Sequence, residues 1–107
     1  MKPMKESDWK IFKQIKEKAL ARFCEIALAD FSEIINNNEE HICERYTELY
    51  KLVRMRDKEL AKLFDDHSRS KATLQLLLIR KAGLADYELL QKLSDEFSQD
   101  TDPERLL

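Results

Sequence analysis

The amino-acid sequence predicts an all-α protein, with one long antiparallel helical hairpin and two shorter helices packed on it. The chain of 107 residues contains one glycine, Gly83, and two prolines, Pro3 and Pro103, which lie near its ends. Between them, apolar residues recur at steps of three and four, the spacing of one face of an α-helix. This length suits one core. We therefore expect a single helical domain over residues 1–97 and a polar, flexible tail over residues 98–107.

The first predicted helix covers residues 8–35, with Ser7 as its N-cap. Its apolar residues form two neighbouring columns, an arrangement typical of a helix that contacts more than one neighbour. The columns are Phe12, Ile15, Ala19, Phe23, Ala27, Phe31 and Ile34, and beside them Leu20, Cys24, Leu28 and Ile35. The asparagines at 36–38 are expected to end the helix, because asparagine tolerates the left-handed conformation found there. Asn37 and Glu40 form a weak variant of a capping box for the next helix.

The second predicted helix covers residues 39–66, and its apolar seam alternates steps of four and three as a heptad does. The seam consists of Ile42, Tyr46, Leu49, Val53, Arg56, Leu60 and Leu63. Residues 8–35 and 39–66 have equal lengths of roughly 42 Å at 1.5 Å per residue, which suits an antiparallel hairpin. Since residues 65–70 include no glycine or proline, the alternative is one continuous helix over residues 39–82.

Two shorter helices are predicted after the hairpin. The third covers residues 69–82, is capped by Ser68 or Ser70, and ends at Gly83, because glycine favours the left-handed position that follows a helix. The fourth covers residues 86–97 and buries the side chains of four apolar residues. These are Leu89, Leu90, Leu93 and Phe97.

The composition excludes several classes of site. With so little glycine, the chain cannot form a phosphate-binding loop or a dinucleotide-binding fingerprint. Cys24 and Cys43 do not have the spacing of a metal or redox motif, and the hairpin offsets their sulfurs by roughly 10 Å, so we expect free thiols. No nucleophile and base pair is evident. The sequence therefore predicts no enzyme, no catalytic residue, no cofactor and no bound metal.

The sequence also predicts a location in the cytoplasm and no contact with a membrane. The longest apolar runs are residues 26–29 and 76–79, four residues each, whereas a spanning helix needs about 20. The N-terminal residues include lysines but no apolar stretch of the kind that a secretory signal requires.

Charge is distributed unevenly along the chain. Two segments are basic: residues 1–22 hold seven basic and three acidic side chains, and residues 51–81 hold nine basic and four acidic ones. The other two are acidic: residues 23–50 hold one basic and seven acidic side chains, and residues 82–107 hold two basic and seven acidic ones. Folding the chain back at the asparagines brings the two positive segments together and predicts a surface for an anionic partner. Its residues are Lys10, Lys13, Lys16, Lys51, Arg54, Lys58 and Lys62. An acidic protein or a nucleic acid would suit this surface. Alternatively, the acidic fourth helix or a second copy of the chain covers it.

The third predicted helix is apolar around nearly its whole circumference. Leu74, Leu77 and Leu78 are its candidate self-association surface, because a chain of this size can hardly cover every side of such a helix internally. The sequence therefore predicts a homodimer. The function that it favours is a cytosolic protein-interaction or adaptor module. The alternative is an accessory nucleic-acid-associated protein that uses the basic end of the hairpin.

Overall fold

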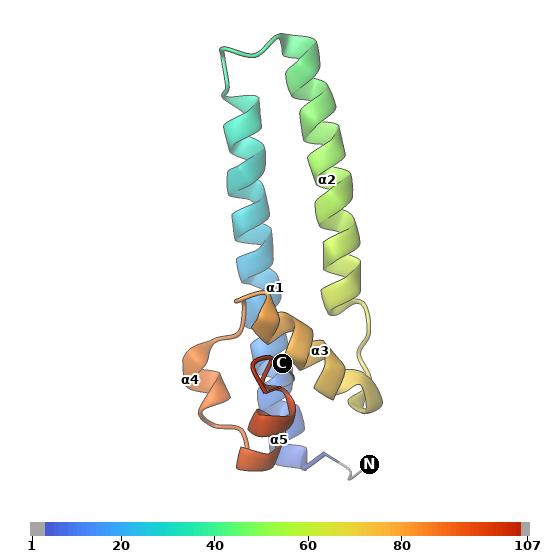
Figure 1. Cartoon of the computed structure of the whole chain (residues 1–107), viewed down its shortest axis with the longest axis vertical. Coiled ribbons are helices and arrows are strands. Elements are labelled where there is room, and N and C mark those ends of the chain that lie inside the picture. Colours follow the sequence, from blue (N-terminus) through green and yellow to red (C-terminus); the bar gives the residue numbers. More distant parts are fainter. Residues whose placement is uncertain (1–3, 106–107) are drawn as a thin grey trace.

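Five α-helices and one 3-10 turn form the part of the chain that the structure, a computed structural model, describes, residues 4–105. The helices are α1 (Glu6–Ile35), α2 (Ile42–Phe64), α3 (Ala72–Lys81), α4 (Tyr87–Leu90) and α5 (Asp95–Asp100), and the turn is η1 (Arg69–Lys71). Helices α1 and α2 form a long antiparallel hairpin, and the shorter helices gather at its open end (Figure 1). The predicted all-α hairpin architecture is confirmed.

Helix α1 ends at Ile35 as predicted, but the starts of both long helices differ from the prediction. Helix α1 begins at Glu6, and its N-cap is Lys5 rather than Ser7. Helix α2 begins at Ile42 rather than at residue 39, because His41 is its N-cap and accepts a hydrogen bond from the backbone N–H of Cys43 at 3.1 Å. The Asn37 side chain instead accepts from the N–H of Glu39 at 3.2 Å, so it stabilises the loop and does not cap α2.

The helix is interrupted between α2 and α3, so the alternative of one continuous helix over residues 39–82 is wrong. The break depends on Gln75 of α3, whose side chain is buried and donates to the carbonyl oxygens of Leu63 at 2.9 Å and Asp66 at 2.8 Å. Carbonyls at a helix end need such partners once their own helix stops. Ser68 is the N-cap of η1 but makes no capping hydrogen bond through its side chain.

Gly83 ends α3 as predicted, with a φ of 75°. The N–H of Gly83 donates to the carbonyl of Arg80 at 3.0 Å, and the N–H of Leu84 donates to the carbonyl of Ile79 at 3.2 Å. These two bonds and the positive φ define a Schellman motif. Leu84 also packs against the cluster that contains the buried Ile79, which is the apolar contact that often accompanies this motif.

The predicted fourth helix, residues 86–97, is in fact two short helices, α4 and α5, with a turn between them. The turn follows from Ser94, which caps α5 by accepting a hydrogen bond from the N–H of Phe97 at 3.3 Å. Asp8 of α1 fixes Ser94 in place, since its carboxylate accepts from the Ser94 N–H at 2.8 Å and from the Ser94 hydroxyl at 2.6 Å. A contact across 86 residues therefore decides where α5 begins.

The described residues of the expected tail, 98–105, also differ from the prediction. Helix α5 continues to Asp100, and Thr101 is completely buried. Arg80 of α3 donates one hydrogen bond to the Ser98 carbonyl at 2.7 Å and another to the Thr101 hydroxyl at 3.0 Å. Residues 98–101 thus pack on the domain rather than extending from it.

The core occupies only the base of the hairpin. One cluster surrounds Trp9, Phe12 and Ile15 of α1, and it includes residues of α3, α4 and α5. A second, smaller cluster joins Ala19, Phe64 and Ile79. The molecule extends 54 × 27 × 23 Å, because the rest of the hairpin continues beyond these clusters (Figure 1).

We predict that Asp8→Ala destabilises the protein by about 2 kcal/mol, because it leaves the Ser94 N–H without its charged acceptor. Asp8 is only 2% exposed, so water cannot easily replace the lost carboxylate. Urea unfolding followed by circular dichroism measures the change. The control is Glu17→Ala on the exposed side of α1, which should shift stability by no more than about 0.5 kcal/mol. Equal stabilities for the two variants would contradict the role of Asp8.

Candidate docking surface

The part of the hairpin beyond the core is exposed on most sides. It consists of residues 20–35 of α1 and 42–57 of α2, and we call it the distal hairpin. Ala27 is the one side chain within these two segments that is buried. Two helices alone cannot enclose their apolar residues, because each helix covers only one side of the other.

The two helices of the distal hairpin meet along a seam. It is formed by Phe23, Ala27, Asp30 and Ile34 of α1 and by Arg45, Leu49, Leu52 and Arg56 of α2. Arg56 lies in the seam as predicted, with its guanidinium 3.2 Å from the Asp30 carboxylate and 3.0 Å from the Glu59 carboxylate. Arg45 donates to the carbonyl oxygen of Ile35.

Three members of the predicted seam, Ile42, Tyr46 and Val53, are exposed instead. They lie beside the true seam because the apolar arc of α2 is wider than α1 can cover. They belong to a set of seven exposed apolar side chains on the distal hairpin, which we call the apolar hairpin face. Its members are Leu20, Leu28, Ile35, Ile42, Tyr46, Tyr50 and Val53. Tyr46 is 74% exposed, Ile42 70% and Leu28 65%.

Helix geometry puts all seven residues on the same side of the hairpin. Successive residues of a right-handed helix rotate by about 100°, clockwise when viewed from the N-terminus. On α1, the exposed residues are rotated clockwise from the side that faces α2. On α2, they are rotated clockwise from the side that faces α1. Because the helices are antiparallel, the same rotation leads to the same side, and the seven residues form one surface.

By the same rotation, the apolar hairpin face carries no charge between residues 20 and 35 of α1 or between residues 42 and 53 of α2. Two charged residues border it towards the base: Asp57, and Arg54, which lies over the Tyr50 ring at 5.7 Å and donates to the Tyr50 hydroxyl at 3.3 Å. The opposite side of the distal hairpin is charged. It carries Arg22, Glu25 and Glu33 of α1 and Glu44, Glu48 and Lys51 of α2. The distal hairpin is therefore amphipathic as a unit.

Helix α3 lies on the charged side and leaves the apolar hairpin face open. Ala82 and Leu84, directly after α3, line a pocket of about 230 Å³ together with Ile26 and Glu59, which are on that side. In Figure 1, α3 crosses in front of α1, so the apolar hairpin face is on the far side of that view. None of the shorter helices reaches the end of the hairpin (Figure 1).

The structure does not unite the residues predicted to bind an anionic partner. Lys51, Arg54, Lys58 and Lys62 are exposed and form a stripe on the side of α2 that faces away from α1. Lys10 and Lys13 are exposed on the first turns of α1, and Lys13 lies over the Trp9 ring at 5.8 Å. These two groups point in different directions.

Lys16 is half-buried between the helices and donates to the carbonyl oxygen of Asp66. Burial lowers the pKa of Lys16, and the nearby carboxylates of Asp66 and Asp65 offset part of that effect. The acidic segment that was expected to cover the basic residues instead makes an ion pair with a lysine outside the predicted set. Asp86 lies 3.4 Å from the ammonium group of Lys18.

The three leucines predicted for self-association differ in exposure. Leu74 is 57% exposed, whereas Leu77 and Leu78 are half-buried. Two of their neighbours on α3, Leu76 and Ile79, are completely buried. Helix α3 is thus mainly a core helix, and it offers far less open apolar area than the apolar hairpin face.

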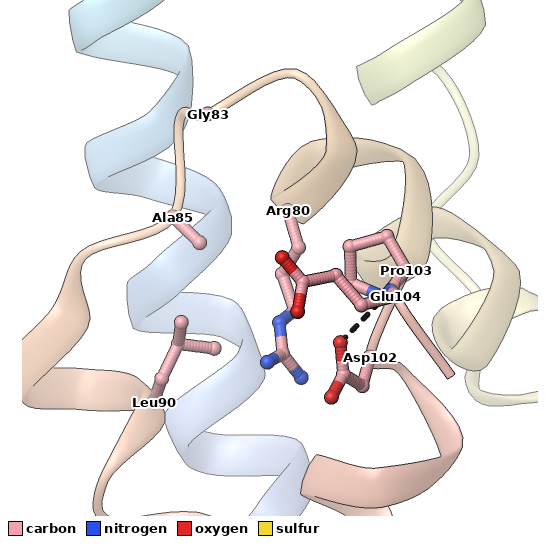
Figure 2. Close-up of a pocket in the computed structure, with 7 residues that line it drawn as sticks. All are labelled: Arg80, Gly83, Ala85, Leu90, Asp102, Pro103 and Glu104. Carbon is pink, nitrogen blue, oxygen red and sulfur yellow. Dashed lines mark hydrogen bonds between the residues drawn. The ribbon is translucent and has the colours of Figure 1, made fainter. Parts of the chain in front are cut away.

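A pocket of about 380 Å³ lies between the end of α3 and the C-terminal segment (Figure 2). Its cation is Arg80, which is already hydrogen-bonded to Ser98 and Thr101. Asp102 accepts from the N–H of Glu104 at 3.0 Å on the other side of the pocket. These groups stabilise the fold of residues 98–105, so the pocket is not the candidate site.

Metal, thiol and membrane chemistry add no further candidate. Across residues 4–105, no set of three or more histidine, cysteine and carboxylate side chains could hold a metal ion. Cys24 and Cys43 are free thiols, as predicted, and both are exposed. No helix in the same range has both the length and the apolar character needed to cross a bilayer.

Comparison with known proteins identifies no relative: no family model, no curated protein and no solved structure matches the chain significantly. The docking surface is therefore defined by its own residues. The sequence shows part of this docking surface, since Leu20, Leu28 and Ile35 belong to the second apolar column of α1. The two columns predict a helix that contacts more than one neighbour, but periodicity reports which residues share a side and not which element covers it.

The end of the hairpin is acidic, and two carboxylates there interact directly. A hydrogen bond from Glu40 and the negative charge of Glu40 raise the pKa of Glu44. A raised pKa in the folded state means that this pair favours folding at low pH and that the contribution is lost as pH rises through the pKa of Glu44.

We predict that Glu40→Gln lowers the pKa of Glu44, because the substitution removes the like charge and supplies an amide that donates to the carboxylate. An NMR titration of the Glu44 side-chain carboxyl measures the shift. Glu25→Gln, on the opposite helix, is the control and should leave this pKa unchanged. A Glu44 titration that is identical in the Glu40→Gln variant and the wild type would rule out the coupling.

Proposed function

We propose that this protein is a protein-interaction module, acting in the cytosol, and that it binds a protein partner on the apolar hairpin face. One observation carries the proposal. Seven of the eleven exposed large apolar side chains in residues 4–105 lie on a single side of the distal hairpin. Exposed apolar residues are ordinary when scattered, whereas a contiguous patch that is bordered by polar residues is typical of an interaction site.

The composition of the face supports a protein as the partner. Tyr46 and Tyr50 provide large contact areas with a polar end, and tyrosine is enriched among the residues that dominate binding energy. Burial of a large aliphatic side chain such as Leu28 or Ile42 contributes about 1.5–3 kcal/mol. The absence of charge from the centre of the face suits an interface core, where charged residues are depleted.

The pairing of the two helices supports the same function. The Arg56–Asp30 ion pair and the half-buried seam hold α1 and α2 together, so the face is present before any partner arrives. A surface that is already ordered binds with a smaller loss of conformational entropy than a segment that must fold on binding.

We predict that a photo-crosslinking amino acid at Tyr46 captures a protein in the native cell, either another protein or a second copy of this chain. The same amino acid at Lys51, on the charged side of α2, is the matched control and should capture much less. Leu28→Glu should abolish the Tyr46 crosslink, because a carboxylate in an apolar interface is strongly unfavourable. Equal crosslinking from Tyr46 and Lys51, or crosslinks that persist in Leu28→Glu, would refute docking on this face.

A nucleic-acid-associated role is the second candidate, and the stripe of Lys51, Arg54, Lys58 and Lys62 favours it. Four cations along one helix edge could contact successive phosphates, and such contacts weaken steeply with salt. This function predicts a gel shift of single- or double-stranded nucleic acid at about 50 mM salt that is largely lost at about 200 mM. Lys58→Glu combined with Lys62→Glu should abolish the shift. No retardation of DNA or RNA by the wild type at low salt would reject this candidate.

A further inference from the structure

We propose that the partner on the apolar hairpin face is a second copy of this chain, and that the two hairpins pack face to face with their ends pointing in opposite directions. The product is a four-helix bundle in which each chain contributes α1 and α2. This inference rests on the docking function proposed above and assigns its occupant.

The exposed area is large enough for a stable homodimer. The exposed fractions of the seven residues range from 37% to 74% and together amount to about four complete side chains. At roughly 150–250 Å² for each large side chain, this is on the order of 600–1,000 Å². A standard interface buries about 800 Å² on each partner. A two-fold interface uses the same surface on both copies, so the whole face is covered at once.

The architecture of the chain allows this packing. Helix α3 and the shorter helices lie on the other side of the hairpin or at its base, so they do not obstruct a copy that approaches the apolar hairpin face. Two antiparallel hairpins that stack face to face form the interior of a four-helix bundle. The uncharged middle of the face would become the core of that bundle.

Charge selects the relative direction of the two hairpins. Residues 23–50, which include the end of the hairpin, carry seven acidic side chains and one basic side chain. Hairpins that pointed the same way would bring two such acidic ends together. Hairpins that point in opposite directions bring the loop of each chain, with Glu39 and Glu40, towards the base of the other chain, where Lys13 is exposed.

Two observations favour this surface over the one that the sequence predicts for self-association. On α3, Leu77 and Leu78 are half-buried in the domain, and only Leu74 is exposed. On the distal hairpin, by contrast, seven large apolar side chains remain exposed on one side. The area that Leu74 alone could bury is too small for a stable dimer.

We predict that sedimentation equilibrium gives twice the chain mass for the wild type and the single-chain mass for Tyr46→Glu at the same concentration. The substitution should raise the dissociation constant at least about a hundredfold, because each interface would bury two unpaired carboxylates. Tyr46 is 74% exposed, so the monomer should retain its circular dichroism. Met55→Glu is the matched control, because Met55 is also exposed, at 53%, but lies on the charged side of α2, and this variant should remain dimeric.

The two native cysteines provide a second readout on the unmodified protein. Cys24 lies on α1 beside Leu20 and Leu28, and Cys43 lies at the first turn of α2, towards the edge of the face. Alkylation of Cys24 should slow as protein concentration rises, whereas alkylation of Cys43 should change less. Rates for both cysteines that are independent of concentration would overturn the proposed dimer.

The direction of packing is tested with spin labels at Asn38→Cys, in a chain that also carries Cys24→Ser and Cys43→Ser. The loop lies roughly 10 residues beyond the centre of the face, so opposite directions separate the two labels by about 30 Å or more. Parallel hairpins would bring the labels much closer together, and a short distance would overturn the proposed direction.

The outcomes separate this inference from the docking function. A wild type that stays monomeric, but whose Tyr46 crosslinker captures a different protein, overturns the second copy as partner while the docking function stands. A monomeric wild type with no crosslink from Tyr46 overturns both. A dimer that survives Tyr46→Glu but dissociates in Leu74→Glu also overturns the inference, because self-association would then use α3.

Discussion

Enclosure of the first half of α1 by α3, α4 and α5 is the interaction on which the other features depend. Phe12 and Ile15 of α1 and Leu76 of α3 are completely buried there. Asp8 adds a polar anchor by holding Ser94 at the start of α5. The short helices are too small to extend this enclosure to the far end of the hairpin (Figure 1). Residues directly after α3 still reach Phe23, Ile26 and Ala27, whereas the later turns of α1 pack against α2.

An amphipathic distal hairpin follows directly from that limit. Each helix uses one side to contact its partner, and the remaining apolar residues of both helices fall on the same side because the helices are antiparallel. The charged residues take the other side, where α3 also lies. Contact between the exposed apolar side chains and water is unfavourable, and a second protein surface that covers them removes this unfavourable contact. The fold thus explains where the proposed docking surface is and why it faces away from α3.

Much of the fold was predictable because it depends on local signals. Gly83 marks a chain reversal through its own backbone preference. The asparagines end α1 at the predicted place but not by the left-handed conformation expected of them, since Asn36 has a φ of −94° and Asn37 acts through its side chain on the Glu39 N–H. The starts of α2 and α5 were not predictable in this way, since His41 and Ser94 compete with other polar residues as caps. The break after Phe64 depends on Gln75, a helix former whose partners lie in another element. Thr101 is likewise held by Arg80 of another element. Because the local sequence of residues 98–101 is polar and does not show this contact, it predicts a tail.

The sequence by itself determined the all-α class, the hairpin, and the identity of the apolar and charged residues along each helix, because propensity and periodicity act within one segment. Only the tertiary structure decided which apolar columns are covered. Leu76 and Leu28 are the same residue type in similar helical patterns, yet Leu76 is completely buried and Leu28 is 65% exposed. The difference arises because burial depends on which elements pack against a surface, and the short helices gather at the base of the hairpin rather than along it.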